Sequence, residues 1–301
     1  MLGNNQNSFD LNFKNNNMLS KLIYVNLAVF ILVHLLILPF WLMNVSASAD
    51  YFATQWLAVP SDLGRMITRP WSILTYMFLH LDFWHILMNM IWLYFLGQLF
   101  VEFLGEKKLY TVYIAGGIAG ALLYIIFYNV FPVFELALPT SKALGASASV
   151  MAIVVAIATH VPNFSIRLMF IGSVKLKYIA IFFFVVDLLS MSNSNSGGHI
   201  AHIGGAALGF FFAKNWQKNM DITAWVNTAT DFIIAIFKPS KQKLKVRYSQ
   251  GKKSSKQSST SRKKDEQAKV DEILDKISRS GYDSLSKEEK DFLFKASNNQ
   301  K

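Results

Sequence analysis

Residues 145–156 read Gly-Ala-Ser-Ala-Ser-Val-Met-Ala-Ile-Val-Val-Ala, a turn of small residues that leads directly into an apolar run. About sixteen helical residues separate Gly145 from the polar Pro162 and Asn163, whereas a helix that crosses a bilayer needs roughly 20. In a membrane, this helix would therefore begin below the surface. Non-helical backbone at that depth is tolerated only within protein or beside a wet cavity. The stretch thus predicts a water-accessible pocket inside the bilayer, with Ser147 at the start of the helix.

The composition places the chain among membrane proteins. Hydrophobic residues make up 52% of its 301 residues, and they include 25 Phe and 7 Trp, well above the norm for soluble domains. The absence of cysteine excludes disulfides, thiolate nucleophiles and cysteine-based metal centres. The polar segment before Lys21 has no short apolar region followed by a small-residue cleavage site, so we expect no cleavable signal peptide.

Six apolar segments are predicted to be transmembrane helices, which makes the expected fold class an all-α, polytopic membrane protein. They run over about 22–43, 82–103, 109–130, from Ser147 towards Pro162, 178–189 and 199–214. The last three are short for a full crossing. Small residues recur every fourth position in the fourth segment (Ala148, Ala152, Ala156) and in the sixth (Gly205, Gly209), so we expect these two helices to pack closely.

The loops carry an asymmetric distribution of positive charge. One side has Lys14, Lys21, Lys107, Lys108, Arg167, Lys175, Lys177 and the basic tail, and the other has only Arg65, Arg69 and Lys142. By the positive-inside rule, both termini are expected in the cytoplasm of a protein in the cytoplasmic (inner) membrane. Ser147 and His202, at the starts of the fourth and sixth segments, then lie towards the outer face.

The predicted domain organisation has five parts. A polar cytoplasmic segment (1–20) precedes the six-helix membrane domain (21–214), which is followed by an interfacial amphipathic helix (215–238), a disordered basic linker (239–264) and a small helical hairpin (265–301). Apolar residues at helical spacing and a capping box, Ser286-Lys287-Glu288-Glu289, predict the hairpin. Two interpretations of it remain open, a docking site for a cytoplasmic partner and a solubilising tail without one.

Most of the net positive charge lies in the tail. Residues 214–301 hold 20 Lys and Arg against 11 Asp and Glu, whereas residues 1–213 hold 10 against 8. A basic tail behind several membrane spans is expected to meet the anionic headgroups of the bilayer, each nearby cation contributing about 1 kcal/mol. We expect no nucleic-acid partner.

Polar residues at the ends of the second, fourth and sixth segments are candidates for a hydrolytic site. A serine attacks a carbonyl only if a base takes its proton and donors stabilise the oxyanion. Ser147 is the candidate nucleophile, although Ser149 and Ser141 fit the pattern equally well. His202 should face the fourth segment and His199 should lie nearer the surface. The oxyanion donors available are His85, Asn89 and the N–H of Ser147.

Several alternatives stay open on the residues alone. The histidines His80, His85, His199 and His202 could bind a metal, but no His-Glu-x-x-His motif or carboxylate cluster accompanies them, so we expect neither a metal nor a cofactor. On these residues alone, a transporter or a scaffold protein is as good an interpretation as a hydrolase. No acidic residue is evidently placed to orient an imidazole, which favours a Ser–His dyad over a triad.

Three motifs together resemble the rhomboid family of intramembrane serine proteases. They are His80-x-x-x-x-His85-x-x-x-Asn89, Gly145-x-Ser147 and Ala201-His202-x-x-Gly205-x-x-x-Gly209, and the resemblance covers roughly residues 20–213. It implies a six-helix fold, Ser147 as nucleophile, His202 as general base, and an oxyanion hole formed by His85, Asn89 and the Ser147 N–H. His80 and the motif glycines Gly145, Gly205 and Gly209 would be structural.

The resemblance implies an endopeptidase that cleaves single-span membrane proteins in or near their transmembrane segments. The alternative is a catalytically inactive relative that binds or traffics membrane proteins. Asp187, an ionisable residue near the end of the fifth segment, is a functional candidate by default. Because that segment lies at the lateral substrate opening in rhomboids, one hypothesis is that Asp187 bonds to loop residues and holds this gate closed. The alternative is a carboxylate that simply reaches the water at the outer headgroups.

Overall fold

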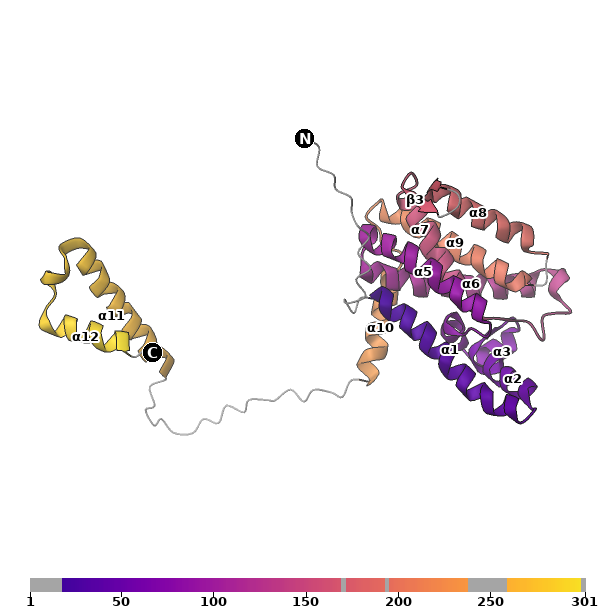
Figure 1. Cartoon of the computed structure of the whole chain (residues 1–301), viewed down its shortest axis with the longest axis horizontal. Coiled ribbons are helices and arrows are strands. Elements are labelled where there is room, and N and C mark those ends of the chain that lie inside the picture. The colour runs from indigo at the N-terminus through magenta and orange to yellow at the C-terminus, as the bar shows by residue number, and fades with distance from the viewer. Residues whose placement is uncertain (1–17, 169–171, 193–194, 238–258, 299–301) are drawn as a thin grey trace. The chain divides into compact units, whose positions relative to one another are not determined.

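A computed structural model describes residues 18–168, 172–192, 195–237 and 259–298. The chain forms two compact units, residues 1–239 and 240–301, and each is considered by itself. The described part of the first unit is mainly a bundle of helices, with two short antiparallel strand pairs (Figure 1).

The described residues of the first unit form ten α-helices. They are α1 (Met18–Leu42), α2 (Ser46–Leu57), α3 (Leu63–Thr68), α4 (Ser72–Thr75), α5 (Phe83–Leu104), α6 (Glu106–Val130), α7 (Ser147–His160), α8 (Leu176–Ser190), α9 (Ser196–Trp216) and α10 (Ala224–Phe237). Two 3-10 helices, η1 (Tyr76–Phe78) and η2 (Pro132–Phe134), lie in the connections. Strand β1 (Val59–Pro60) pairs with β2 (Lys142–Ala143), and β3 (Ser165–Leu168) pairs with β4 (Gly172–Lys175).

Three helices among the described residues are long and apolar enough to cross a membrane, namely α1, α5 and α6. Each begins and ends within four residues of the predicted segment. The other three predicted segments also form helices, but α7 has 14 residues and α8 has 15. α9 has 21 residues, and its glycines and histidines lower its hydropathy. The described part of the chain is therefore largely helical, with three helices that have the length and composition of membrane spans.

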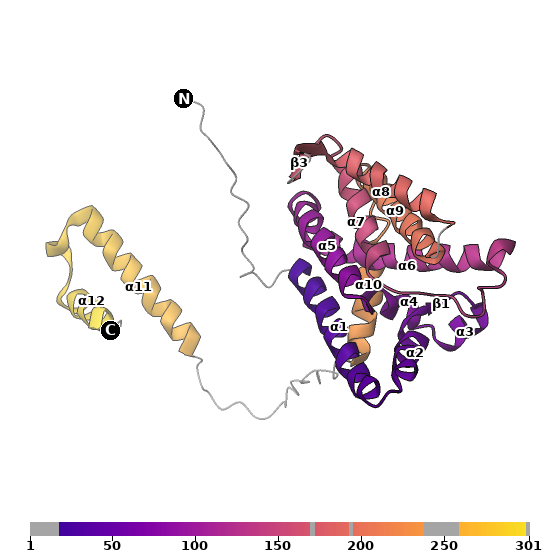
Figure 2. The same cartoon turned by 45° about the vertical axis from the view of Figure 1, so that its right-hand side comes forward.

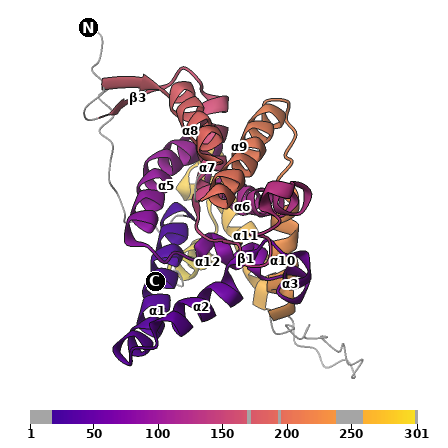
Figure 3. The same cartoon turned by 90° about the vertical axis from the view of Figure 1, so that its right-hand side faces the viewer.

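Helix α7 lies at the centre of the bundle and packs against α6 and α9. Ten of its 14 residues are buried, so lipid cannot surround this short helix. A Cβ atom on Gly205 would collide with the carbonyl group of Ala148, and one on Gly209 with that of Ala152. The predicted close packing between these small-residue faces is confirmed. Helices α1 and α8 lie on opposite sides of the bundle (Figures 1 and 3).

A network of polar contacts holds the long connection that leads from α6 to α7. Besides the pairing of β1 with β2, the buried Ser61 hydroxyl donates to the carbonyl oxygen of Leu138 (2.7 Å), and Asn129 Nδ2 donates to the Ser61 carbonyl (2.8 Å). The hydroxyl of Tyr124 on α6 lies 2.9 Å from that of Ser141. Because these bonds tie the connection to α6, the start of α7 has a defined position.

Helix α10, the predicted interfacial helix, is attached to α6 (Figure 2). Just before it, Asp221 pairs with Lys108, and Thr223 Oγ1 lies 2.8 Å from Thr111 Oγ1. Partial burial acts to raise the pKa of Asp221, but the bonds from Lys108 and Thr223 outweigh it and hold the pKa below its ordinary value. On α10 itself, Phe232 and Ile233 are exposed, as expected of a helix that presents apolar side chains to lipid.

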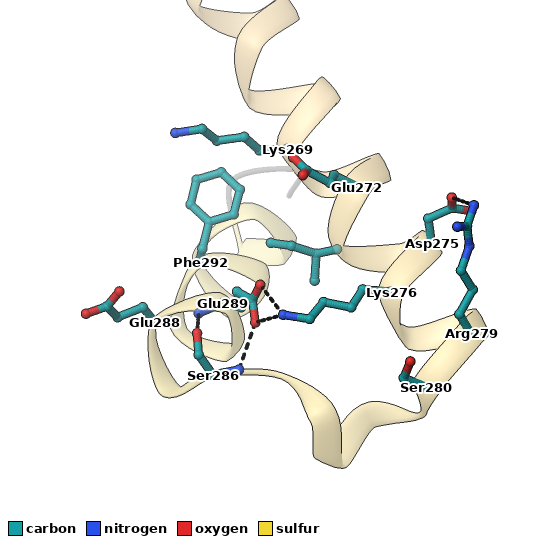
Figure 4. Close-up of a pocket in the computed structure, with 11 residues that line it drawn as sticks. Lys269, Glu272, Asp275, Lys276, Arg279, Ser280, Ser286, Glu288, Glu289 and Phe292 are labelled. Atoms are coloured by element: carbon teal, nitrogen blue, oxygen red, sulfur yellow. Dashed lines mark hydrogen bonds and ion pairs between the residues drawn. The ribbon is translucent and has the colours of Figure 1, made fainter.

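The second unit is a helical hairpin formed by α11 (Ser259–Ser280), the 3-10 helix η3 (Tyr282–Ser284) and α12 (Lys287–Asn298). The predicted capping box is confirmed, because the Glu289 N–H donates to Ser286 Oγ and the Ser286 N–H donates to Glu289 Oε2 (Figure 4). Lys276 Nζ on α11 lies 2.8 Å from Glu289 Oε1. Helix α11 begins at Ser259, inside the predicted linker 239–264; residues 238–258 lie outside the described residues.

Candidate active site

The turn before α7 has a conformation that few residues other than glycine adopt. Gly145 has φ +114°, a region that side chains with a Cβ atom rarely enter. A Cβ atom there would also lie 2.6 Å from the His85 ring. The N–H of Gly145 donates to the Tyr76 carbonyl (2.8 Å), and the N–H of Ala146 donates to His80 Nε2 (3.1 Å). His80 and Gly145 therefore contribute to the conformation of the turn that precedes Ser147.

A pocket of about 510 Å³ lies directly beside this turn. Its walls come from α5, α7, α8 and α9 and from the connection before α7. They include Ser147 and four other polar residues that the sequence placed at the site, His85, Asn89, Asp187 and His202. The structure thus brings together residues that are more than 100 positions apart in the chain.

The pocket distinguishes Ser147 from the two other serines that fit the sequence pattern. Ser147 is half-buried and lines the pocket. Ser149 is fully buried, and its hydroxyl lies 3.9 Å from Met77 Sδ on the opposite side of α7. Ser141 Oγ is engaged by Tyr124. Among the three, only Ser147 combines a position at the start of α7 with access to the pocket.

The carboxylate of Asp187 is shared by two histidines. Its Oδ1 atom lies 2.8 Å from Nδ1 of His202 and 2.8 Å from Nδ1 of His199. Asp187 is buried on α8, and both histidines lie one turn apart on one face of α9. Because an ionised carboxylate only accepts hydrogen bonds, each Nδ1 atom must carry the proton. The Nε2 atom of a neutral His202 then has a lone pair, as a general base requires.

Two further groups in the pocket can donate hydrogen bonds to an anion. One N–H of the Asn89 amide donates to the His85 carbonyl (2.8 Å), which leaves its second N–H available. The first N–H groups of an α-helix have no partner within the helix, so the N–H of Ser147 is also available. Together with the His85 ring, these donors line the same pocket as the Ser147 hydroxyl.

Comparison with known proteins gives two family matches and one similar relative. Residues 68–216 match the Rhomboid domain family, and residues 257–299 match a family of unknown function, DUF6576. The protein named "RHOMBOID-like protein 12, mitochondrial" from Arabidopsis thaliana is 30% identical over 197 residues, which cover 62% of this chain and 54% of the relative. The chain belongs to the rhomboid family. It spans little more than half the length of that relative.

The rhomboid match includes every predicted site residue, from His80 to Gly209. Helix α1 lies outside the matched residues, although its Asn26 side chain reaches the Tyr113 hydroxyl on α6 (3.0 Å). The hairpin unit matches a different family, DUF6576, and lies outside the residues that match the Rhomboid domain.

One expectation about the rhomboid site is wrong, because an acidic residue does lie beside the imidazole. Among the described residues, Asp187 bonds to His202 and His199, whereas the gate hypothesis expected it to bond to loop residues. The signal was present in the sequence: an ionisable residue within a membrane helix needs a partner, and two histidines follow it on the next helix.

The sequence also did not point to Lys142, which lines the pocket from β2. Its Nζ atom lies 3.1 Å from Thr54 Oγ1 and 5.0 Å from the centre of the Tyr51 ring. Partial burial, followed by the nearby charges of Arg65 and Arg69, lowers the pKa of Lys142. It adds a positive charge to one rim of the pocket.

Proposed function

We propose that this rhomboid protein is an active intramembrane serine endopeptidase. The observation that carries the proposal is the His202–Asp187 contact, with His202 and Ser147 lining one pocket. The bond to Asp187 leaves the Nε2 atom of His202 as an acceptor, and the pocket also offers oxyanion donors. An inactive binding protein has no need for a base and a hydroxyl facing one water-accessible cavity.

The proposed reaction is acyl transfer from a peptide bond to Ser147 and then to water. His202 Nε2 takes the proton of the Ser147 hydroxyl as its oxygen bonds to the peptide carbonyl carbon. The oxyanion accepts hydrogen bonds from the Ser147 N–H, the free Asn89 amide N–H and His85. Protonated His202 then donates to the leaving amine as the C–N bond breaks. A water molecule, deprotonated by His202, hydrolyses the acyl-enzyme.

Asp187 is a positioning residue in this proposal. It holds the imidazole of His202 in one orientation and one tautomer, and its negative charge stabilises the imidazolium that forms during proton transfer. The proposal therefore extends the predicted Ser–His dyad with a carboxylate on the neighbouring helix.

The proposed arrangement in the membrane follows from charge and hydropathy. Helices α7, α8 and α9 complete six membrane segments with α1, α5 and α6. Both termini lie in the cytoplasm, and the pocket opens towards the outer face of a cytoplasmic membrane. The proposed substrates are single-span membrane proteins cleaved in or near their transmembrane segments. The basic tail meets anionic headgroups, and the hairpin is available to a cytoplasmic partner.

Covalent labelling tests the proposed activity. A fluorophosphonate probe should label the full chain in membranes and should fail to label the Ser147→Ala variant. Ser149→Ala is the matched control, because Ser149 starts the same helix but is buried away from the pocket. Absence of labelling in the native chain, under conditions that label an active rhomboid, would overturn the proposal in favour of the inactive binding protein.

A further inference from the structure

The side chains of Asp187, His199 and His202 form a cluster of three groups that can each donate a lone pair to a metal ion. Their ligand atoms all lie within 4.8 Å of one another. The two imidazoles come from one face of α9 and the carboxylate from α8, so the cluster bridges two helices. The His199 and His202 rings are 5.9 Å apart and nearly perpendicular, with both Nδ1 atoms directed at Asp187 Oδ1.

We infer that this cluster is a binding site for a divalent transition-metal ion such as Zn²⁺, and that the bound metal reversibly inhibits the proposed hydrolysis. The donor set is two imidazole nitrogens and one carboxylate oxygen, which suits Zn²⁺ and Co²⁺. Mg²⁺ and Ca²⁺ prefer all-oxygen sites and are excluded by the two nitrogens. Three protein ligands leave one position for water.

The spacing of the three groups is close to that of a metal site. In a tetrahedral site with bonds of 2.0–2.1 Å, neighbouring ligand atoms lie roughly 3.3 Å apart. The two nitrogen–oxygen distances here are 2.8 Å. Side-chain rotations that lengthen each of them by about half an ångström bring them to the tetrahedral value. The metal would occupy the place of the two protons now shared between the imidazoles and the carboxylate.

Access and charge also favour a metal. The side chains of His199 and His202 are 20% and 21% exposed, whereas that of Asp187 is 7% exposed. Asp187 and His202 line the 510 Å³ pocket, which connects the cluster with water. The carboxylate of Asp187 supplies an anionic ligand beside the two imidazoles, which favours a cation at this cluster.

The inhibition follows from the chemistry of the imidazole ring and rests on the proposed function. A neutral imidazole carries one proton. When its Nδ1 lone pair binds a metal, that proton must reside on Nε2. His202 Nε2 is then a donor and cannot take the proton of Ser147. Removal of the metal by a chelator restores the proton to Nδ1 and the lone pair to Nε2.

Cobalt spectroscopy tests the site without any need for activity. The full chain with Ser147→Ala, carrying a purification tag without histidine, is titrated with Co²⁺ in detergent. We expect the visible absorption bands of a four-coordinate Co²⁺ ion, saturating at one ion per chain and removed by Zn²⁺. Mutation of residues that only support the metal ligands already lowers metal affinity 10–100-fold. Loss of a ligand by His199→Ala in the Ser147→Ala chain should therefore weaken Co²⁺ binding by about tenfold or more.

His160→Ala is the matched control, because His160 ends α7 and belongs to no cluster of three or more potential metal ligands among the described residues. It should leave the cobalt spectrum unchanged. Failure to observe the bands, or equal binding with and without His199, would overturn the metal site.

A second measurement tests the inhibition. Zn²⁺ should reduce substrate cleavage by the native chain, a chelator should restore it, and His199→Ala should require about tenfold more Zn²⁺ or more. Equal zinc sensitivity of both proteins would overturn the inhibition. If the metal-free chain neither cleaves substrate nor reacts with the fluorophosphonate, but the cobalt bands depend on His199, the proposed protease activity is wrong and the metal site stands.

Discussion

The Oδ1 atom of Asp187 on α8 lies 2.8 Å from the Nδ1 atom of His202 on α9. This contact gives the general base of the proposed site one orientation and one tautomer. It also gives Asp187 a role different from the predicted closed gate, and the two hypotheses predict opposite effects of removing the carboxylate.

The first prediction concerns this carboxylate. Asp187→Asn should lower kcat by roughly 10²–10⁴-fold, the range of a general-base contribution, because the amide no longer selects the productive tautomer of His202. The KM of a single-span substrate should change little, and the acid limb of the pH profile should shift. A residue that holds a gate closed would behave differently, because its loss should raise turnover. An unchanged rate and pH profile would rule out both roles.

The second prediction concerns the coupling of Ser147 and His202. Ser147→Ala and His202→Ala should each abolish cleavage of a single-span substrate, and the double variant should lose no more activity than either single one, because the two groups act as a unit. Turnover by purified variants in proteoliposomes measures this. Ser149→Ala, which leaves the pocket intact, should retain turnover. Substantial cleavage by Ser147→Ala would mean that another group is the nucleophile.

The third prediction concerns the support of the turn by His80. His80→Ala removes the acceptor of the buried Ala146 N–H, and an unsatisfied buried group costs about 1–3 kcal/mol. Thermal unfolding in detergent should therefore occur at a lower temperature, and labelling of Ser147 should slow. His80→Gln retains an acceptor and should recover part of both. His160→Ala serves for comparison, because the buried Nδ1 atom of His160 has no partner in the described structure. Equal effects at positions 80 and 160 would contradict the prediction.

The fourth prediction concerns acid unfolding of the hairpin. The bond from Lys276, followed by that from the Ser286 N–H, holds the pKa of Glu289 below its ordinary value of 4.5. A carboxyl group whose pKa is lower in the folded than in the unfolded hairpin stabilises the fold at a pH above its unfolded pKa. This stability is lost as the pH falls through its folded pKa. The helical NMR shifts of α12 should thus decrease below about pH 4.5. Glu289→Gln should remove this step, whereas Glu288→Gln, its exposed neighbour, should retain it.

The fifth prediction concerns independence of the two units. Deletion of residues 240–301 should preserve cleavage in detergent, because the pocket is built entirely from residues of the first unit. If the tail is cytoplasmic and the pocket opens outward, a hydrocarbon core about 30 Å thick also separates them. In anionic liposomes, binding of the full chain to headgroups should weaken with salt and with the deletion. Loss of detergent activity in a folded truncated chain would show that the tail belongs to the catalytic unit.

Local patterns in the sequence were sufficient to locate all six principal helices of the bundle and the capped hairpin. Apolar runs determine where helices form in a membrane, and small residues at every fourth position determine which faces approach closely. For the same reason, the placement of His85 and Asn89 on one face of α5, and of Ser147 at the start of α7, followed from spacing along the chain. Whether α7, α8 and α9 cross the membrane did not follow, because α7 and α8 have only 14 and 15 residues and the glycines and histidines of the 21-residue α9 lower its hydropathy.

Only the tertiary structure decided which groups meet across helices. Ser141, Ser147 and Ser149 fit the sequence pattern alike, and the rotation of α7 against α6 and α9 directs Ser147 into the pocket and Ser149 against Met77. Asp187 and His202 are 15 positions apart, and a loop between them leaves the relative rotation of α8 and α9 undefined by spacing. Packing sets that rotation, because the contacts that orient one helix about its axis come from its neighbours and not from its own sequence.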